Sequence, residues 1–354
     1  MNSIKLVTLI SLFSLSQLSF AAACPASSTS TAAGAADGSN CSVTGTASTI
    51  QLNFITGFND GTIIAAAGGN GGTTVGAQRK LSFVKAAEIL ADQVQSTQTI
   101  IVDAAFSLLS CDAGSATLGS AGASVNTHHP SPPGGMTANT WYPIGLYNNK
   151  ANNDNFLPGA DVYTGNATGS DVNSNFNSNI GNAGCLAASN GWYYGFDAPP
   201  SNYIGFTTVF LHEITHGLGF ASMVSSSTGA KNGGVDDIYS NYLYDQVNGS
   251  WPALSNAQRA ANAISGTALL WNGSNVNTQA IGQLTAGYHD DDSSGAFTSG
   301  DRVQMYAPNP VESGSSVSHF NTAAAPNELM EPQYTEGQMD LGLALYLLKD
   351  IGWS

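Results

Sequence analysis

Charged side chains are scarce in this chain of 354 residues, and basic ones are scarcer than acidic ones. Only 9% of the residues are charged, and 24 acidic residues stand against 9 basic ones, which gives a formal net charge of −15. A surface with this balance repels phosphate groups, so the composition argues against binding of nucleic acid or of an anionic membrane surface. The hydrophobic fraction of 42% is that of a globular protein.

Cysteines are also few, and no two of them form a C-x-x-C pair. This absence argues against a cysteine-based metal or redox site. An even number of cysteines in an exported chain indicates disulfides, and four cysteines allow three pairings. Proximity in the sequence favours Cys24–Cys41, which leaves Cys111–Cys185.

Long apolar runs are absent after the opening segment, MNSIKLVTLISLFSLSQLSFAAAC. This segment has a lysine, a short apolar run and then small residues, which is the pattern of a secretory signal peptide. Cleavage after Ala21 or after Ala23 fits equally well. The alternatives are a membrane anchor, for which the run is short and serine-rich, and a lipid-modified Cys24, although Ala21 stands where such signals usually have Leu. We therefore expect residues 1–23 to be removed and the mature protein to be secreted, extracellular or periplasmic, and free of the membrane.

Hydrophobic periodicity indicates an α+β fold. The segment 24–47 is rich in Ala, Ser, Thr and Gly and is expected to form a disulfide-tied leader. Alternating apolar residues predict a strand at 49–56, and an apolar stripe at helical spacing predicts a helix over 77–95. A second strand is predicted at 99–109. This strand–helix–strand opening indicates a sheet with a helix packed on it.

Besides a surface helix over 255–265, two further helices are expected later in the chain. The first covers 201–219, with Ser201 or Asn202 as a plausible N-cap. The second covers 339–353 and closes the chain as an amphipathic helix, with an apolar face formed by Leu341, Leu345 and Leu348. The predicted organisation is an N-terminal subdomain over 48–222 and a polar, loop-rich C-terminal subdomain over 223–354.

The stretch VFLHEITHGLGF, residues 209–220, contains two histidines and a glutamate among apolar residues. Residues four apart share one face of a helix, so His212 and His216 project together and could bind one metal ion. Neutral imidazole nitrogens are good zinc ligands. Glu213 is rotated about 100° from His212 and lies beside the ion, where a carboxylate can move protons to and from a zinc-bound water. The spacing is the H-E-x-x-H pattern of zinc peptidases, and the competing explanation is a chance match within a core.

The longer stretch HEITHGLG resembles the H-E-x-x-H-x-x-G motif of the metzincin metallopeptidases. The resemblance implies a sharp turn at Gly219 and a metzincin-like catalytic domain, with a twisted mixed sheet and two long helices in the N-terminal half. In most of that clan the third ligand falls three residues after the glycine, but this chain has Ser222 there. Asp236 or Asp237 could replace it, whereas a downstream glutamate of the thermolysin kind is absent before Glu312.

Leishmanolysin-like metzincins have a long insertion before the third histidine, and a methionine-bearing turn follows it. The stretches SHF and ELMEP repeat that order here. The resemblance therefore implies His319 as the third ligand and Met330 as the Met-turn residue. It also suggests Tyr334 as a stabiliser of the oxyanion, although the spacing is longer than usual. The other histidines, His128, His129 and His289, are expected in loops or turns.

These features predict a zinc metallopeptidase, monomeric and acting on protein or peptide substrates, with Glu213 as the general base. Calcium is a second candidate metal because the chain is rich in aspartate. Its candidate ligands are Asp290, Asp291, Asp292, Asp236 and Asp237. Two other functions remain open: a non-catalytic exported zinc-binding adhesin or binding protein on a protease-like scaffold, and a metal-dependent hydrolase of another bond, such as an amide in a cell-wall peptide.

Overall fold

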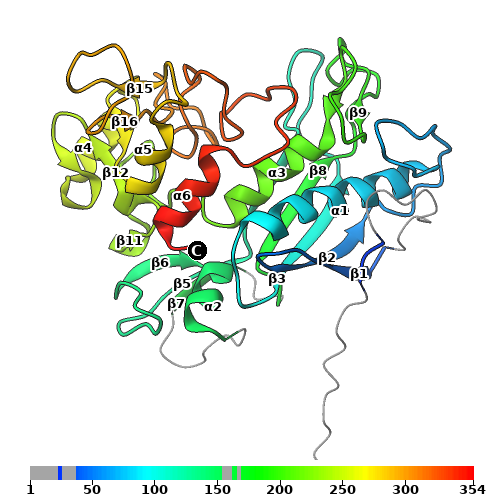
Figure 1. The fold of residues 1–354 in the computed structure, drawn as a ribbon, viewed down its shortest axis with the longest axis horizontal. Helices are drawn as coiled ribbons and strands as arrows, with labels where there is room; N and C mark the ends of the chain where they lie inside the picture. Colours follow the sequence, from blue (N-terminus) through cyan, green and yellow to red (C-terminus); the bar gives the residue numbers. More distant parts are fainter. Residues whose placement is uncertain (1–22, 26–36, 154–161, 166–168) are drawn as a thin grey trace, which may run out of the picture.

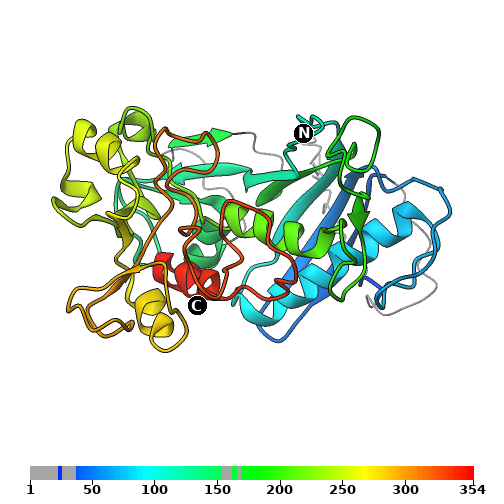
Figure 2. The same ribbon diagram turned by 90° about the horizontal axis from the view of Figure 1, so that it is seen from above.

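The computed structural model describes residues 23–25, 37–153, 162–165 and 169–354, and Figure 1 presents their arrangement. The predicted signal peptide, residues 1–23, lies outside the described residues except for Ala23. The fold is α+β, with open mixed sheets and helices packed on them (Figures 1 and 2). The predicted fold class is thus confirmed at this level.

The larger sheet has the strand order β1-β2-β3-β8-β4. Its central strands β2, β3 and β8 run parallel, and β1 and β4 join them in antiparallel orientation at the two sides. The predicted strand at 49–56 coincides with β2, because its alternate residues Ile50, Leu52 and Phe54 are buried. The bounds of these strands are β1 Ser39–Thr44, β2 Thr49–Thr56, β3 Ile100–Ser107, β4 Gly119–Ala123 and β8 Val172–Asn177.

Helices α1 (Val75–Gln93) and α3 (Phe206–Gly217) lie side by side across one face of this sheet (Figure 1). Helix α1 begins at Thr74, whose hydroxyl accepts the Ala77 N–H and caps the first turn. Both helices bury their apolar residues against the sheet. The sheet thereby fixes α3, the helix that carries the two histidines.

A second sheet, of order β11-β6-β5-β7, links the two parts of the sequence, since β11 from the C-terminal stretch pairs with β6. Residues from both predicted subdomains also contribute to one hydrophobic cluster. The remaining strands are β5 Val125–His128, β6 Thr140–Pro143, β7 Val162–Gly165, β9 Trp192–Tyr193, β10 Ile204–Gly205, β11 Asp236–Asp237, β12 Leu243–Asp245, β13 Gly249–Ser250, β14 Leu269–Trp271, β15 Tyr288–His289 and β16 Arg302–Val303. The other helices are α2 Ile144–Ala151, α4 Asn256–Asn262, α5 Ser274–Ala280 and α6 Leu343–Ile351, with short 3-10 turns at Asn232–Gly234, Ser240–Tyr242 and Trp251–Ala253.

The closing helix α6 lies near α3, between the elements of the N-terminal half of the chain and those of the C-terminal half (Figure 1). The indole N–H of Trp353, just after α6, donates to the carbonyl of Leu218 at the end of α3, at 2.8 Å. The predicted apolar face was partly wrong. Leu341 and Leu348 are buried, but Leu345 is only half-buried, because the buried face runs through Leu343, Ala344, Leu347 and Ile351 instead.

The start of α3 also differs from the prediction. The helix begins at Phe206 rather than after Ser201 or Asn202, because Ile204–Gly205 forms the short strand β10 and pairs with β9. Gly205 is the N-cap residue and offers no side-chain cap. Asn202 instead has a positive φ of 68° in the preceding turn.

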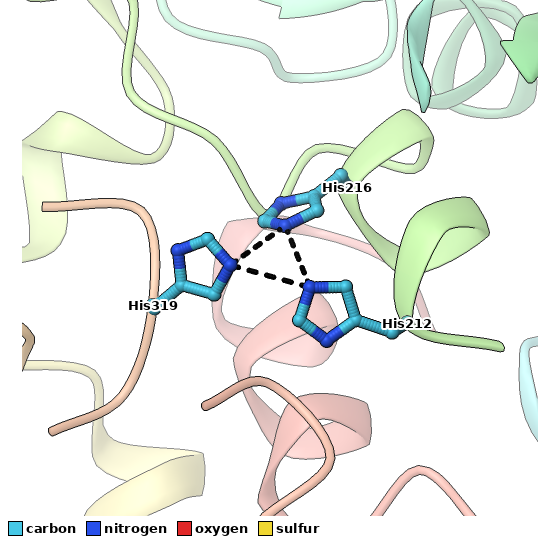
Figure 3. Close-up of side chains that lie close together, drawn as sticks. All are labelled: His212, His216 and His319. Atoms are coloured by element: carbon cyan, nitrogen blue, oxygen red, sulfur yellow. Dashed lines mark hydrogen bonds between the residues drawn. The ribbon is translucent and has the colours of Figure 1, made fainter. Parts of the chain in front are cut away.

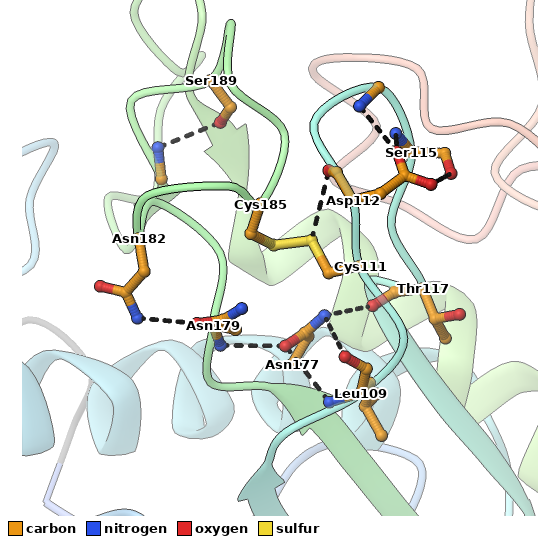
Figure 4. Close-up of a disulfide and its surroundings, with 12 residues drawn as sticks. Leu109, Cys111, Asp112, Ser115, Thr117, Asn177, Asn179, Asn182, Cys185 and Ser189 are labelled. Carbon is orange, nitrogen blue, oxygen red and sulfur yellow. Dashed lines mark hydrogen bonds between the residues drawn. A yellow bond between two sulfur atoms is a disulfide. The ribbon is translucent and has the colours of Figure 1, made fainter.

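Both predicted disulfides are present, Cys24–Cys41 and Cys111–Cys185. The second joins the loop that follows β3 to the loop that follows β8 (Figure 4). Beside it, the side chain of Asn177 donates to the carbonyl of Thr117 at 2.9 Å, two residues before β4 begins. Two disulfides fit an oxidising compartment. No helix in the described part of the chain combines the length and the apolar character that a membrane crossing requires.

Candidate metal centre

Helix α3 carries His212, Glu213 and His216 on its accessible side. Its other side chains, among them Phe210 and Ile214, are buried in the core. His212 and His216 are four residues apart and partly buried, so both rings reach the same edge of the helix.

The end of α3 is shaped by Gly219. This residue has a φ of +119°, a conformation that favours glycine, and its N–H donates to the carbonyl of His216 at 3.0 Å. The chain then turns back, so the carbonyl of Phe220 lies 2.7 Å from Nδ1 of His216. The glycine therefore both stops the helix and brings a hydrogen-bond acceptor to the second histidine.

The chain returns to this helix end 96 residues later. The N–H of Ser222, the position three residues after Gly219, donates to the hydroxyl of Ser318 at 3.1 Å. In most metzincins the third ligand stands at the position of Ser222, and His319, next to Ser318, approaches α3 at the same place. Its side chain is buried, with 4% of its surface exposed.

The structure brings the three imidazoles together (Figure 3). Nε2 of His216 lies 3.2 Å from Nε2 of His212 and 3.1 Å from Nε2 of His319. The third side of the triangle, between His319 and His212, is 3.2 Å. Two nitrogens that each lie 2.0–2.1 Å from a tetrahedral zinc ion are about 3.3 Å apart, so the spacing fits such an ion.

The opposite nitrogen of each ring, Nδ1, faces a backbone carbonyl. The three contacts are His212 to Leu329 at 2.8 Å, His216 to Phe220 at 2.7 Å and His319 to Ser315 at 2.8 Å. A carbonyl oxygen can only accept, so Nδ1 of each ring must carry the proton. In the neutral rings, all three Nε2 atoms then direct lone pairs at one another. This arrangement is repulsive by itself and could bind a metal ion.

The imidazoles are held neutral by their surroundings. Burial lowers the pKa of His212, His216 and His319, because a desolvated ring disfavours its charged form. For His216, burial and the neighbouring His212 bring the pKa down to about 3. Neutral imidazole is the form that binds metals.

Glu213 lies beside this cluster and against strand β4. Burial raises the pKa of its carboxyl group to about 7, although the backbone N–H of Ala121 in β4 hydrogen-bonds the carboxylate and works in the opposite direction. A carboxyl group with this pKa exchanges protons readily near neutral pH.

The turn that contains Met330 connects two of the histidine segments through its backbone. Leu329 accepts the Nδ1 proton of His212, and the carbonyl of Met330 accepts the N–H of Phe320, next to His319, at 2.8 Å. Met330 itself is fully buried. The turn thus fixes the positions of His212 and His319 relative to each other.

Tyr334 lies at the other end of the helix. Its hydroxyl accepts the N–H of Gly205 at 2.8 Å, and Gly205 precedes His212 by seven residues, or about 10 Å along the helix axis. Burial raises the pKa of Tyr334, which keeps the hydroxyl protonated. In this structure Tyr334 supports the start of α3 and is not grouped with the imidazoles.

The alternative third ligands have other partners. Asp236 forms an ion pair with Lys231 at 2.6 Å. Asp237 is buried and accepts the N–H groups of Met223 and Ser240 at 3.1 and 2.7 Å. Neither belongs to the group formed with His212 and His216.

A second group of candidate ligands lies in an acidic turn. Carboxylate oxygens of Asp290, Asp292 and Asp301 lie within 4.8 Å of one another. Asp291 instead pairs with His289 at 2.9 Å and with Arg302 at 3.2 Å. Exposed carboxylates often gather without a cation, so this turn carries no metal assignment.

The remaining histidines lie elsewhere. His128 ends strand β5, with its ring packed edge-on against Trp141 at 4.3 Å. The ring of His129 accepts the N–H of Ser131 at 2.9 Å, in the loop that follows.

Sequence reasoning missed several residues of the centre. The carbonyls of Leu329, Phe220 and Ser315 orient the rings, but a backbone group leaves no signal in residue types. Strand β4 was also missed, because its sequence, GSAGA, has no alternation of polar and apolar residues. Asp301 could have been noticed as a further acid near Asp290 and Asp292.

Compared with known protein families, curated proteins and solved structures, the chain has no match. Its function must therefore be inferred from the geometry of the centre itself.

Proposed function

We propose that this chain is a secreted zinc-dependent metalloendopeptidase of the metzincin type, with a leishmanolysin-like spacing between its metal ligands. The observation that carries the proposal is the convergence of three Nε2 lone pairs from His212, His216 and His319, beside a carboxylate. A cluster of this kind without a cation would destabilise the fold, since its lone pairs repel one another and its rings are desolvated.

Zinc is the metal that this donor set favours. Three imidazoles leave a fourth tetrahedral position open, which is the arrangement of catalytic zinc sites. Imidazole also binds copper, nickel and iron, so the identity of the metal is part of the proposal. A zinc ion held there would polarise a carbonyl group and lower the pKa of a bound water to about 7.

Glu213 is the proposed general base. Its carboxylate would take a proton from the attacking water and later return it to the amine of the leaving peptide. In the metal-free chain, burial raises the pKa of this carboxyl group to about 7. The N–H of Ala121 would hold the carboxylate in place between these steps.

The substrate is proposed to be an extended peptide that pairs with strand β4. In the described part of the chain β4 is the last strand on its side of the sheet, so one row of its backbone groups can pair with another strand. Its contact with Glu213 would bring a peptide bound there close to the catalytic carboxylate. The small side chains of β4 leave space beside the centre.

The resemblance to metzincins supports this function with details of backbone geometry. Gly219 makes the expected sharp turn. Met330 lies in a turn that is tied to both His212 and the segment of His319. Ser222 marks the start of the long insertion, which returns at Ser318.

The direct experiment is cleavage of casein by the purified mature chain, with zinc content measured on the same sample. We expect about one zinc per chain, cleavage that a chelator abolishes and activity that zinc restores. Bound zinc without cleavage of casein or of any member of a peptide panel would refute the peptidase and favour the binding-protein alternative. Cleavage that persists without metal would refute the role of the three histidines.

A further inference from the structure

Strand β4 passes close to Glu213 at Gly119, a residue with no assigned role so far. A Cβ atom placed on Gly119 would lie 3.0 Å from Cγ of Glu213 and 3.0 Å from the ring of Phe176. Both distances are shorter than an ordinary van der Waals contact, so each neighbour would have to give way by a few tenths of an ångström or the strand would have to shift. The backbone of Gly119 has no positive φ, so conformational freedom does not explain the glycine.

Of these two neighbours, Phe176 cannot move easily. Its ring is fully buried within a cluster of aromatic rings. The centroids of the surrounding rings lie 5.0–5.8 Å away and belong to Phe83, Phe106, Phe206 and Phe210. Close-packed rings of this kind resist displacement.

Glu213 is the neighbour that can yield. Its side chain is only partly buried, and its carboxylate faces the backbone N–H of Ala121 in β4. An added methyl group at position 119 would therefore push the stem of Glu213 away from the strand. The carboxylate would then lose the N–H of Ala121.

We infer that Gly119 is a positioning residue for Glu213: the missing side chain lets the edge strand lie directly against the stem of the glutamate, so that the N–H of Ala121 reaches its carboxylate. This inference rests on the proposed function for its catalytic consequence. Its structural content, the close approach of the Gly119 backbone to the stem of Glu213, does not depend on that function.

Gly61 supplies a matched control. It lies in the loop between β2 and α1, outside the proposed site, and a Cβ atom there would meet nothing within 4 Å. G119A and G61A make the same chemical change, and only G119A presses on Glu213.

The first test is kinetic. A displacement of a few tenths of an ångström at a general base is expected to lower kcat about tenfold, since a 1 Å misplacement can cost 100-fold. We expect G119A to show this loss with KM and zinc content close to those of G61A, which should match the wild type. Equal kcat for the two variants would overturn the inference, and so would a loss of kcat accompanied by equal losses of zinc and thermal stability.

The second test needs no activity. In the metal-free protein, amide hydrogen exchange at Ala121 is followed by NMR. We expect protection in the wild type and G61A, and faster exchange in G119A and in Glu213→Ala. Unchanged protection in Glu213→Ala would overturn the inference even if G119A failed to fold. An inactive wild type that still gave the expected exchange pattern would refute the proposed function and leave the placement of Glu213 intact.

Discussion

Replacement of Glu213 by glutamine tests both its role as general base and the effect of its buried carboxyl group on stability. Gln has the same shape and keeps an oxygen that can accept the N–H of Ala121, so the fold and the three histidines should be undisturbed. It cannot take a proton from water. If Glu213 is the general base, kcat should fall by a factor of about 10²–10⁴ while zinc binding stays close to that of the wild type.

The same substitution should stabilise the metal-free protein at high pH. Burial raises the folded-state pKa of Glu213 from 4.5 to about 7. A carboxyl group whose pKa is raised on folding stabilises the fold while it is protonated, and this contribution is lost as the pH rises through the folded pKa. From pH 5 to pH 8 the wild type should lose about 2.5 kcal/mol through this group, and E213Q should lose none of it.

The assay compares urea unfolding of chelator-treated wild type and E213Q at pH 5 and pH 8, alongside cleavage of casein by the zinc-loaded proteins. A matched control is E88Q, the same change on a half-exposed glutamate of α1 that pairs with Lys85. Cleavage by E213Q at the wild-type rate would refute the general-base role. A stability difference between the two proteins that does not change with pH would refute the buried, proton-binding environment of Glu213.

Three further predictions follow from the same structure. H319A should lower zinc affinity by more than about 100-fold, since loss of a residue that only hydrogen-bonds a metal ligand already costs 10–100-fold. The control H289A, which alters a histidine in the acidic turn, should leave zinc affinity unchanged. Equal affinities of the two variants in a competition titration would exclude His319 as a ligand. Zinc affinity of the folded protein should fall by much less than about 1,000-fold between pH 7.5 and pH 5.5, because burial lowers the pKa values of the three rings. Three histidines with ordinary pKa values would lose about 1,000-fold, and a loss of that size would contradict the depressed pKa values. Removal of the Cys111–Cys185 disulfide, which spans 74 residues, should lower the free energy of unfolding in urea by about 4 kcal/mol. Removal of the Cys24–Cys41 disulfide, which spans 17 residues, should lower it by about 3 kcal/mol. The reverse order would show that loop length does not govern the contributions of the two disulfides.

The regular elements with a strong hydrophobic pattern could be predicted from the sequence. Strand β2 was predicted with its observed bounds because each alternate side chain is apolar and buried. The start of α3 could not be predicted, since Ile204–Gly205 forms a strand only through a partner, Trp192–Tyr193, that lies elsewhere in the chain. Strand β4 has small residues with no periodic pattern, so only its pairing with β8 defines it.

The centre was predictable to the extent that side-chain identity determines it. His212, Glu213 and His216 follow from helical spacing alone. His319 was reached only by resemblance, because no local rule relates residues separated by 103 positions. The tautomers of His212 and His216 depend on carbonyl groups positioned by the turn at Met330 and by Gly219, and that of His319 depends on the carbonyl of Ser315. Such backbone contacts appear only in the folded chain.

The central claim, that three imidazoles bind one zinc ion, is tested most directly by the zinc-edge X-ray absorption spectrum of the loaded protein and of H319A. The wild-type spectrum should require three imidazole nitrogens at 2.0–2.1 Å, and the H319A spectrum should require one imidazole fewer. A wild-type spectrum without three imidazoles at this distance, or one that H319A leaves unchanged, would contradict the claim.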